Sequence, residues 1–418
     1  MAMLHRRQGI DYPLLIIALS LTAFGIAMVF SAGQTDVPSF VANLWKRQLA
    51  FFAVSLLACL AVSHGSVRLL EWSAWPLYLL SCALLVVVLL VGSGAGTAAS
   101  VKGWLSIGGI RIGQPAELAK LATTLMLARV LAAQRGQPRG LLELWRPLVV
   151  VGVPWMLVMA QPDLGTGIVF IGICFAMLFW AGVSWPVLLM LASPGISLIL
   201  AFSTGAWGAW FFLLCALMLW YRPYLLEGVA LMLANVAMGI AAPILWESLK
   251  PHQRNRLMVF VDPSVDPRNA GWHVIQSKVA IGSGGVFGKG FTLGSQKRLQ
   301  FLPERHTDFI FSVVGEELGF IGVAVALSLF LALFLRATRV ATRANDAFPS
   351  LLAFGLMSVW AIHVIENVGM TLSLMPVTGI PLPFFSYGPS FLLVSWISVA
   401  IMLRVSAEGR GLPDAIGL

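Results

Sequence analysis

The chain has 418 residues and a formal net charge of +9, and 59% of its residues are hydrophobic while only 11% are charged. With a mean hydropathy of +0.88, it has too few polar side chains to cover the surface of a water-soluble globule. The composition therefore excludes a soluble enzyme and predicts an integral membrane protein surrounded by membrane lipid, with no nucleic acid among its partners.

Apolar runs of membrane length recur along the whole chain. A helix needs about 20 residues to cross a hydrocarbon core of ~30 Å, and by this measure we expect about twelve transmembrane helices. The runs fall near residues 13–32, 48–65, 70–92, 115–134, 147–161, 165–183, 186–204, 207–221, 225–246, 307–335, 350–374 and 383–405. We therefore expect an all-α polytopic membrane protein, with one membrane domain over residues 1–418.

Arginines fall on alternate connections between these runs, which the positive-inside rule assigns to the cytoplasm. They are Arg6, Arg7, Arg68, Arg135, Arg139, Arg146, Arg222, Arg336, Arg339, Arg343, Arg404 and Arg410. Both termini are then cytoplasmic, and the long polar stretch over residues 247–306 becomes a large extracytoplasmic loop. Its own basic charge does not conflict with the rule, because long loops translocate largely regardless of charge.

The connection before the fourth run, KGWLSIGGIRIGQPAELAK, brings charged residues to the start of a helix. Pro115 suits the first helical turn, where its missing N–H has no intrahelical partner anyway. Glu117 and Lys120 are three residues apart, so they share one helical face and can pair. At membrane depth such a pair either lines a cavity or fixes helix packing. Arg111, just before them, can meet a phosphate or remain solvated.

The sequence QPDLGTG joins the fifth and sixth runs at their outer ends. Asp163 can cap the following helix through its carboxylate, and it can equally face a ligand. Both interpretations stay open at this point.

The large loop is strongly basic. Between residues 251 and 307 it has eight Lys or Arg residues against three Asp or Glu residues, a net charge of +5. Such a loop favours an anionic ligand. Within it, Asp262-Pro263 and Asp266-Pro267 are turn-forming dipeptides, since Asp bonds its own downstream backbone and Pro fixes φ.

A glycine-rich segment, GSGGVFGKG, covers residues 282–290. Glycines allow backbone N–H groups to approach an anion, but the segment fails the P-loop pattern because Ser283 and Gly290 stand where that pattern needs Gly and Ser/Thr. We expect a flexible turn at the membrane surface, with Lys289 as a phosphate contact.

Asp308, Ser312 and Glu316 recur every four residues at the start of the next apolar run. This spacing predicts a polar stripe on one helical face, which suggests a cavity wall. His306 and Arg305 lie close enough in sequence to reach the same mouth. No group of His, Cys, Asp or Glu has the spacing of a structural zinc site.

Taken together, several of these segments resemble one family. The loop and the start of the apolar run after it contain Asp266-Pro267, Gly271-Trp272, Gln276-Ser277-Lys278, LPERHTDF at 302–309 and GEELG at 315–319, and upstream are QPAELAK at 114–120 and QPDLGT at 161–166. These motifs resemble the SEDS family (shape, elongation, division and sporulation) of polytopic peptidoglycan polymerases. The form VTGIPLPF at 377–384 is typical of its elongation branch (RodA), whereas the division branch (FtsW) usually has T-K-G.

The chain departs from that family in having more apolar sequence between the A-G-x-S-W turn and the large loop. SEDS proteins usually have ten spans, with one helix between an A-G-x-S-W turn and the loop. Here AGVSW at 181–185 and Pro251 leave room for three helices. We interpret residues 186–221 as an inserted helix pair that preserves the sidedness of the rest.

The resemblance implies a peptidoglycan glycosyltransferase that polymerises lipid II during cell elongation and cell-shape maintenance. The family places its essential carboxylate at the second Asp-Pro, here Asp266, which implies that this residue is the catalytic base. The residues that we expect to bind substrate are Glu117, Lys120, Arg111, Asp163, Lys278, Lys289, His306, Asp308 and Glu316. Among them Lys120, Arg111, Lys278 and Lys289 are candidates to stabilise the departing pyrophosphate.

The resemblance also implies partners and a cofactor. We expect lipid II, the growing glycan strand and a class B penicillin-binding protein (a PBP2-like transpeptidase) as partners, and Mg²⁺ or Mn²⁺ as a divalent cofactor. Three alternatives stay open: a division-type polymerase, a flippase or transporter of the lipid-linked precursor, and a scaffold that only recruits the transpeptidase.

Overall fold

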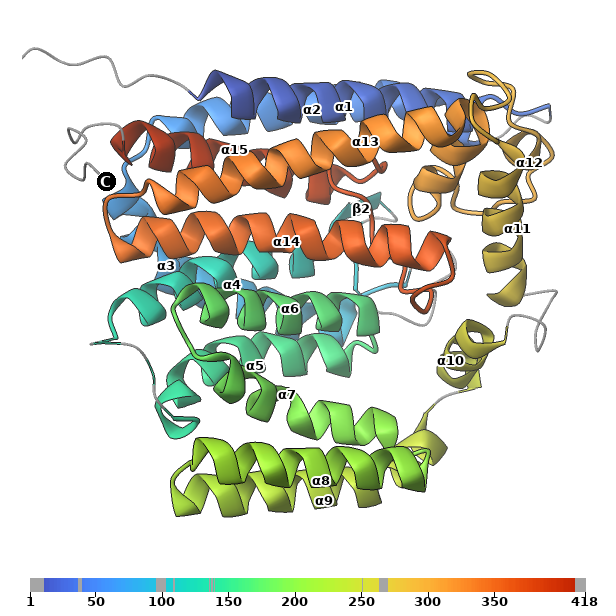
Figure 1. The fold of residues 1–418 in the computed structure, drawn as a ribbon. Helices are drawn as coiled ribbons and strands as arrows, with labels where there is room; N and C mark the ends of the chain where they lie inside the picture. The colour runs from blue at the N-terminus through green and yellow to red at the C-terminus, as the bar shows by residue number, and fades with distance from the viewer. Residues whose placement is uncertain are drawn as a thin grey trace, which may run out of the picture.

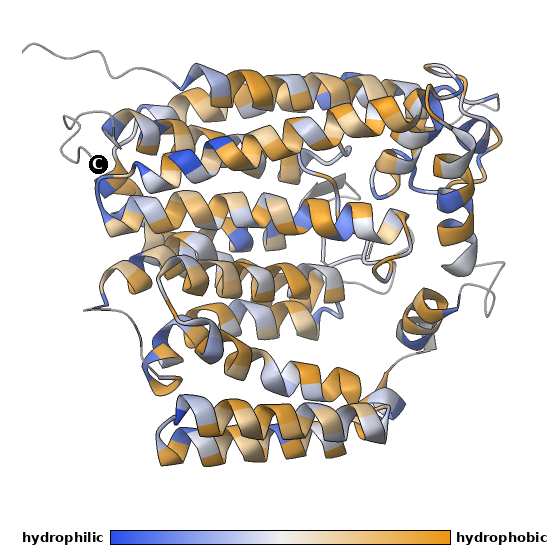
Figure 2. Ribbon diagram, in the orientation of Figure 1, coloured by the Kyte–Doolittle hydropathy of each residue, from blue (hydrophilic) through white to orange (hydrophobic). Residues whose placement is uncertain are grey.

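The computed structural model describes residues 11–36, 40–94, 103–107, 110–134, 136, 138, 140–249, 251–262 and 270–409. Long helices run side by side and form one bundle (Figure 1). Hydrophobic residues dominate the lengths of these helices, and hydrophilic residues gather toward their ends and in the connections (Figure 2). This distribution is that of a helical membrane protein, in which each helix satisfies its own backbone hydrogen bonds.

Twelve helices coincide with the twelve expected apolar runs, so the expected all-α polytopic fold is confirmed. They are α1 (Tyr12–Gly33), α2 (Leu44–Ser63), α3 (Val67–Val91), α4 (Pro115–Ala132), α5 (Trp145–Ala160), α6 (Leu164–Trp180), α7 (Trp185–Leu200), α8 (Thr204–Tyr221), α9 (Leu225–Ser248), α13 (Ile310–Thr342), α14 (Ala347–Thr371) and α15 (Pro389–Gly409). Over the described ranges, nine are long and apolar enough to cross a membrane, and α6 and α7 are shorter apolar helices. The remaining one, α4, carries three charged residues, Glu117, Lys120 and Arg129.

Short elements connect these helices. They are η1 (Phe40–Asn43), β1 (Leu105–Ile107), β2 (Ile110–Gly113), η2 (Leu142–Leu144), α10 (Pro251–Val261), α11 (Ala270–Ser283) and α12 (Ser295–Arg298). The strands β1 and β2 immediately precede α4 in the sequence and pair antiparallel. The stretch that we expected to be a polar loop thus contains three helices, α10 to α12.

The helices differ in how much of their apolar surface the protein itself covers. In α14 and α15, 67% of the most apolar window is buried within the protein, against 6% in α8. Hence α14 and α15 form the centre of the bundle and α8 lies at its edge, beside α7 and α9 (Figure 1). The pair α7 and α8 corresponds to the expected insertion at 186–221, and that interpretation stays a prediction.

The start of α1 and the end of α15 are tied together. Asp11 caps α1 by accepting the N–H of Leu14 at 3.2 Å, and it forms an ion pair with Arg336 of α13 at 2.9 Å. The hydroxyl of Ser406 in α15 also donates to Asp11, at 3.1 Å. The start of α1 and the end of α15 thus share one end of the bundle. Figure 1 shows α11 and α12 at the opposite end.

The run expected as one helix over 307–335 is broken near its start. Gly319 has φ 62° and ψ −158°, so α13 consists of a short helix before this residue and a membrane-length helix after it. The backbone N–H groups of Phe320 and Ile321 donate to the carbonyls of Gly285 and Val286, at 2.9 and 3.2 Å. The break in α13 is therefore satisfied by the glycine-rich segment.

The expectation of a flexible turn at 282–290 was wrong, because this segment packs its backbone into the break. The N–H groups of Lys289 and Gly290 donate to the carbonyls of Glu316 and Glu317, both at 3.0 Å. A Cβ atom on Gly284 would lie 2.0 Å from the carbonyl oxygen of Gly315. The glycines are needed for this close approach of two backbones rather than for mobility.

We expect Gly284→Ala to lower the free energy of unfolding by roughly 1–3 kcal/mol, because the added methyl group would push apart the segment and α13. Gly282→Ala is the matched control, since a Cβ atom there meets nothing within 4 Å. It should leave stability unchanged or raise it slightly, as Ala favours the helical conformation of α11. Thermal and denaturant unfolding of the purified variants in detergent measures both effects. Equal stability of the two variants would contradict the packed arrangement.

Candidate functional site

An ion pair is buried at the start of α4. Pro115 occupies the first turn of this helix as expected. The Nζ atom of Lys120 lies 2.9 Å from Oε1 of Glu117, and the side chains are 1% and 4% exposed. The expected pair at i and i+3 is thus confirmed. Both charges are removed from solvent, and such a pair is stable only if further polar groups surround it.

His363 of α14 supplies such a group. Its Nε2 atom lies 2.8 Å from Nζ of Lys120, and its Nδ1 atom lies 3.0 Å from the carbonyl oxygen of Pro381. Because a carbonyl oxygen only accepts, Nδ1 must carry the proton, and Nε2 then accepts a hydrogen bond from the ammonium group. The imidazole is neutral in this arrangement and stacks on the ring of Phe391 at 4.3 Å. We call Glu117, Lys120 and His363 the α4 ion cluster.

Asp163 lies beside this cluster at the start of α6. Its Oδ1 atom accepts the N–H of Thr166 at 3.0 Å, which confirms the expected helix cap. The amide of Gln114 approaches Oδ2 of Asp163 at 3.5 Å, so the connections that precede α4 and α6 meet here. Three of the expected substrate-binding residues, Glu117, Lys120 and Asp163, are therefore brought together.

Glu366 adds a third carboxylate. It lies on α14, one helical turn after His363, and it is 1% exposed. Its charged neighbours are Lys120 and Asp163, and the hydroxyl of Thr378 is also near. Within the described part of the chain, neither of its carboxylate oxygens has a hydrogen bond of normal geometry, and the same holds for Oε2 of Glu117.

The charge balance of this region limits its ligands. Three carboxylates, Glu117, Asp163 and Glu366, face one ammonium group, and a net negative charge is costly in a low-dielectric interior. Oxygen atoms without partners favour a ligand that brings N–H or O–H donors, and they oppose an anion. The expectation that Lys120 binds the pyrophosphate stays a prediction, and this balance weighs against it.

A second ionic group lies at the break in α13, and we call its four charged residues, Lys289, Lys297, Glu316 and Glu317, the kink clamp. Glu316 pairs with Lys289 at 2.7 Å and accepts the hydroxyl of Ser295 at 2.9 Å. Glu317 pairs with Lys297, and both side chains are fully buried. The clamp fastens α12 and the glycine-rich segment to α13.

The clamp also reaches α1. The ammonium group of Lys297 donates to the carbonyl oxygen and the hydroxyl of Ser31, both at 2.6 Å. Burial lowers the pKa of Lys297, and the carboxylate of Glu317 opposes that shift. Lys289 and Glu316 thus have structural roles, and substrate binding by either residue stays a prediction.

The expected polar stripe is only partly formed. Ser312 and Glu316 lie on α13, where the hydroxyl of Ser312 bonds that of Ser277 at 2.7 Å. Asp308 precedes the helix, which begins at Ile310. It borders Gly379, where an added Cβ atom would lie 3.3 Å from its Oδ2 atom. Asp308 thus lies near the VTGIPLPF segment, apart from the kink clamp.

His306 is packed between two aromatic rings, those of Phe40 and Tyr387, with both centroid distances at 5.8 Å. Burial and, to a smaller extent, the charge of Arg305 lower the pKa of His306 to about 4. Glu304 lies 4.0 Å away, at the limit of an ion pair, and does not offset the burial. The imidazole is therefore neutral at physiological pH.

The three other expected site residues, Lys278, Arg111 and Asp266, have no described contact with the α4 ion cluster or the kink clamp. Lys278 is exposed on α11. Arg111 belongs to β2, and its side chain is outside what the structure describes. Asp266 also lies outside the described residues, in the sequence between α10 and α11. In the ranges that the structure covers, no three His, Cys, Asp or Glu residues are grouped so that they could hold a metal ion.

Two of the residues in this site were missed from the sequence, His363 and Glu366. The available signal was their occurrence three residues apart inside an apolar run, because ionisable residues at membrane depth usually face a partner or a wet cavity.

The comparisons with known proteins cover nearly the whole chain. The model of the FtsW, RodA and SpoVE family, described as cell cycle protein, matches residues 12–207 and 205–411. The peptidoglycan glycosyltransferase MrdB of Escherichia coli (strain K12) is 35% identical over 408 residues, which cover 97% of this chain and 96% of MrdB. A protein of Geobacter sp. (strain M18) named "Probable peptidoglycan glycosyltransferase FtsW" is 33% identical over 417 residues, 98% of this chain and 100% of that protein.

Solved structures agree with these relatives. A chain from a structure titled as structural coordination of polymerization and crosslinking by a peptidoglycan synthase complex has a TM-score of 0.71 and 27% identity, and the match covers 95% of this chain and 98% of that one. The rod shape determining protein RodA of Thermus thermophilus gives a TM-score of 0.62 at 27% identity, with 95% of this chain and 97% of RodA covered.

We expect the wild-type protein to lose stability as the pH falls from 6.5 to 4, relative to a His306→Gln variant. In this range the unfolded chain binds a proton at His306 and the folded protein does not, so protonation favours unfolding. The difference should reach about 3 kcal/mol at pH 4 and vanish above pH 7. Unfolding of both proteins across this pH range measures it. Parallel pH profiles would contradict a buried neutral imidazole.

Proposed function

Because the chain belongs to the family of FtsW, RodA and SpoVE cell cycle proteins, we propose that it is a peptidoglycan glycosyltransferase of the elongation type, which polymerises lipid II into glycan strands. The observation that carries this proposal is the 35% identity with the E. coli peptidoglycan glycosyltransferase MrdB, which extends over 97% of the chain. The VTGIPLPF segment at 377–384 favours the elongation role over the division role.

The reaction is a displacement at the anomeric carbon of the donor sugar. The 4-hydroxyl oxygen of the acceptor forms the new glycosidic bond as the bond to undecaprenyl pyrophosphate breaks, and the hydroxyl proton passes to a general base. A hydroxyl is a weak nucleophile, so a carboxylate must accept that proton during the attack. We assign this role to Asp266. A single displacement inverts the configuration and requires one base, whereas a retaining hydrolase uses a carboxylate nucleophile as well.

The α4 ion cluster belongs to the same reaction site in this proposal. Oε2 of Glu117 and the carboxylate oxygens of the neighbouring Glu366 lack normal hydrogen bonds among the described residues, so they suit the hydroxyl and amide donors of a glycan. The contacts of the cluster between α4 and α14 can hold a sugar in place. The departing pyrophosphate needs cationic groups. Lys278 and Arg111 remain candidates for that role. Lys278 is exposed and forms no ion pair with the other described residues, and Arg111 is a candidate from its place in the sequence before α4.

A divalent cation would stabilise charge on the pyrophosphate. The described residues do not fit a protein-only metal site, and no step above depends on one.

We place the reaction on the outer face of the cytoplasmic membrane, with both termini in the cytoplasm. The hydrogen bond between Ser406 and Asp11 supports this placement, since it puts the start of α1 and the end of α15 at one end of the bundle. The positions of arginines along the chain give that end the cytoplasmic side.

We also propose a class B penicillin-binding protein as partner, since a glycan strand needs peptide cross-linking by a transpeptidase. The structural similarity to a chain of a peptidoglycan synthase complex supports this pairing.

We expect Asp266→Asn to abolish synthesis of glycan strands from lipid II, with a loss of at least about 100-fold, since it removes the base while preserving side-chain size. Asp262→Asn is the matched control: it lies in the other Asp-Pro dipeptide of the same stretch and should retain activity. The assay is strand synthesis by each purified protein, with the unfolding temperature measured in parallel. Strands made by the Asp266→Asn protein would refute the assignment, and a wild-type protein that moves lipid II without joining it would indicate a transporter.

A further inference from the structure

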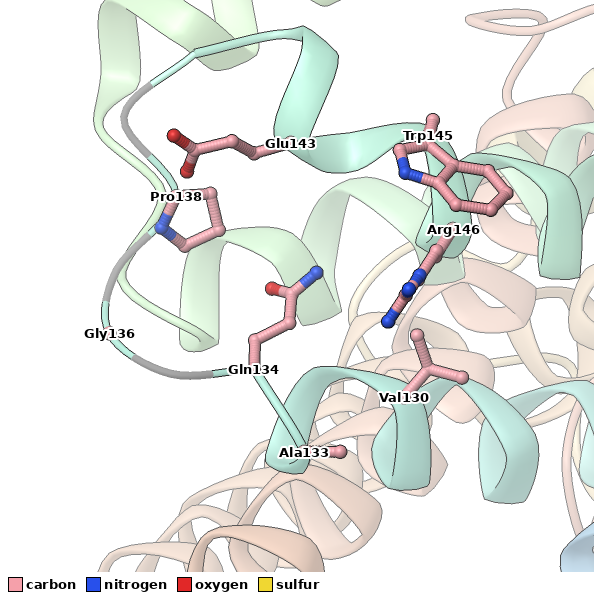
Figure 3. Close-up of a pocket in the computed structure, with 8 residues that line it drawn as sticks. All are labelled: Val130, Ala133, Gln134, Gly136, Pro138, Glu143, Trp145 and Arg146. Atoms are coloured by element: carbon pink, nitrogen blue, oxygen red, sulfur yellow. The ribbon is translucent and has the colours of Figure 1, made fainter.

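A pocket of about 500 Å³ opens between the end of α4 and the start of α5. It lies at the opposite end of the bundle from α11 and α12, so it is remote from the proposed reaction site. The side chains of Gln134 and Arg146 project into it from its two sides, and Val130 and Trp145 form apolar walls (Figure 3). The pocket therefore combines a cationic group, an amide and apolar surface at one helix junction.

The described lining of this pocket has one cationic side chain, Arg146, and one acidic side chain, Glu143. The guanidinium group of Arg146 has no carboxylate partner among the described residues. It lies 5.3 Å from the centroid of the neighbouring Trp145 ring, in a cation–π contact. Glu143, the acidic residue of the lining, already has a partner. The guanidinium group of Arg146 is therefore available to an anionic group.

The apolar surface beside the pocket continues along α5. Trp145, Val149, Val153 and Met156 are exposed by 58, 53, 36 and 58%. They are spaced by four, four and three residues, so they form one stripe on the outer face of the helix. The stripe begins at the pocket and extends toward the middle of the membrane, parallel to the direction of a lipid acyl chain.

We propose that this pocket binds an anionic phospholipid, with the headgroup phosphate at Arg146 and Gln134 and an acyl chain along the stripe on α5. Basic pockets between transmembrane helices at the cytoplasmic side suit anionic headgroups, and tryptophan side chains favour the depth of the headgroups. The arrangement joins a phosphate contact to an apolar stripe about half as long as the hydrocarbon core is thick. A soluble anion would use only the phosphate contact and leave the apolar stripe unused. We therefore assign the site to a lipid.

The test uses the full-length purified protein and compares phosphatidylglycerol with phosphatidylcholine of identical acyl chains. We expect phosphatidylglycerol to raise the unfolding temperature and to bind saturably to the intact protein in native mass spectrometry. Arg146→Gln should weaken the apparent affinity about fivefold, the effect of about one phosphate contact by arginine. Arg343→Gln is the matched control, because it removes one exposed positive charge at the same end of the bundle, outside the pocket, and should bind as the wild type does.

Three results would overturn the proposal. One is equal stabilisation by the two lipids, and another is an equal loss of affinity in both variants, which would indicate only a diffuse surface charge. The third is full protection by inorganic phosphate alone, which would identify a soluble anion as the ligand. The unfolding temperatures of the variants in phosphatidylcholine show that each is folded, so that a weaker lipid effect reports binding.

Discussion

The structure depends on one constraint, which is that ionic groups inside a membrane protein must be satisfied by other parts of the same chain. Lys120 meets it by bonding Glu117 within α4 and the neutral imidazole of His363 on α14. This contact ties together two helices of the core. It also leaves carboxylate oxygens of Glu117 and Glu366 without normal hydrogen bonds in the described part of the chain. An environment of this kind stabilises the helices and is also prepared to receive donor groups from a ligand.

The same constraint explains the break near the start of α13. The helix breaks at Gly319, and a broken helix has backbone groups that need partners. The glycine-rich segment supplies them, and the pairs Lys289–Glu316 and Lys297–Glu317 fasten it in place. The polar stretch is thus anchored to the bundle at α12 and α13. The proposed catalytic residue Asp266 belongs to the same stretch of sequence. A rigid support for a catalytic residue lowers the entropic cost of reaching a reactive geometry.

Local patterns in the sequence predicted local features well. Apolar length gave the twelve long helices, the spacing of Glu117 and Lys120 gave their ion pair, and the QPD motif gave the cap by Asp163. Contacts across long separations could not be predicted, because nothing near Lys120 indicates that its partner is His363, 243 residues later. The glycine-rich segment was misjudged for the same reason, since its hydrogen-bond partners lie about thirty residues downstream at a break that only tertiary structure reveals.

The most direct test of the central claim is the rate of glycan-strand synthesis by a Glu117→Gln/Lys120→Met double variant, measured together with its unfolding temperature. The double substitution leaves neither member of the Glu117–Lys120 pair without its partner, so the double variant should be more stable than either single variant. If the α4 ion cluster belongs to the reaction site, strand synthesis should nevertheless fall by at least about 100-fold. A double variant that is stable and polymerises lipid II at the wild-type rate would show that the cluster serves only the fold.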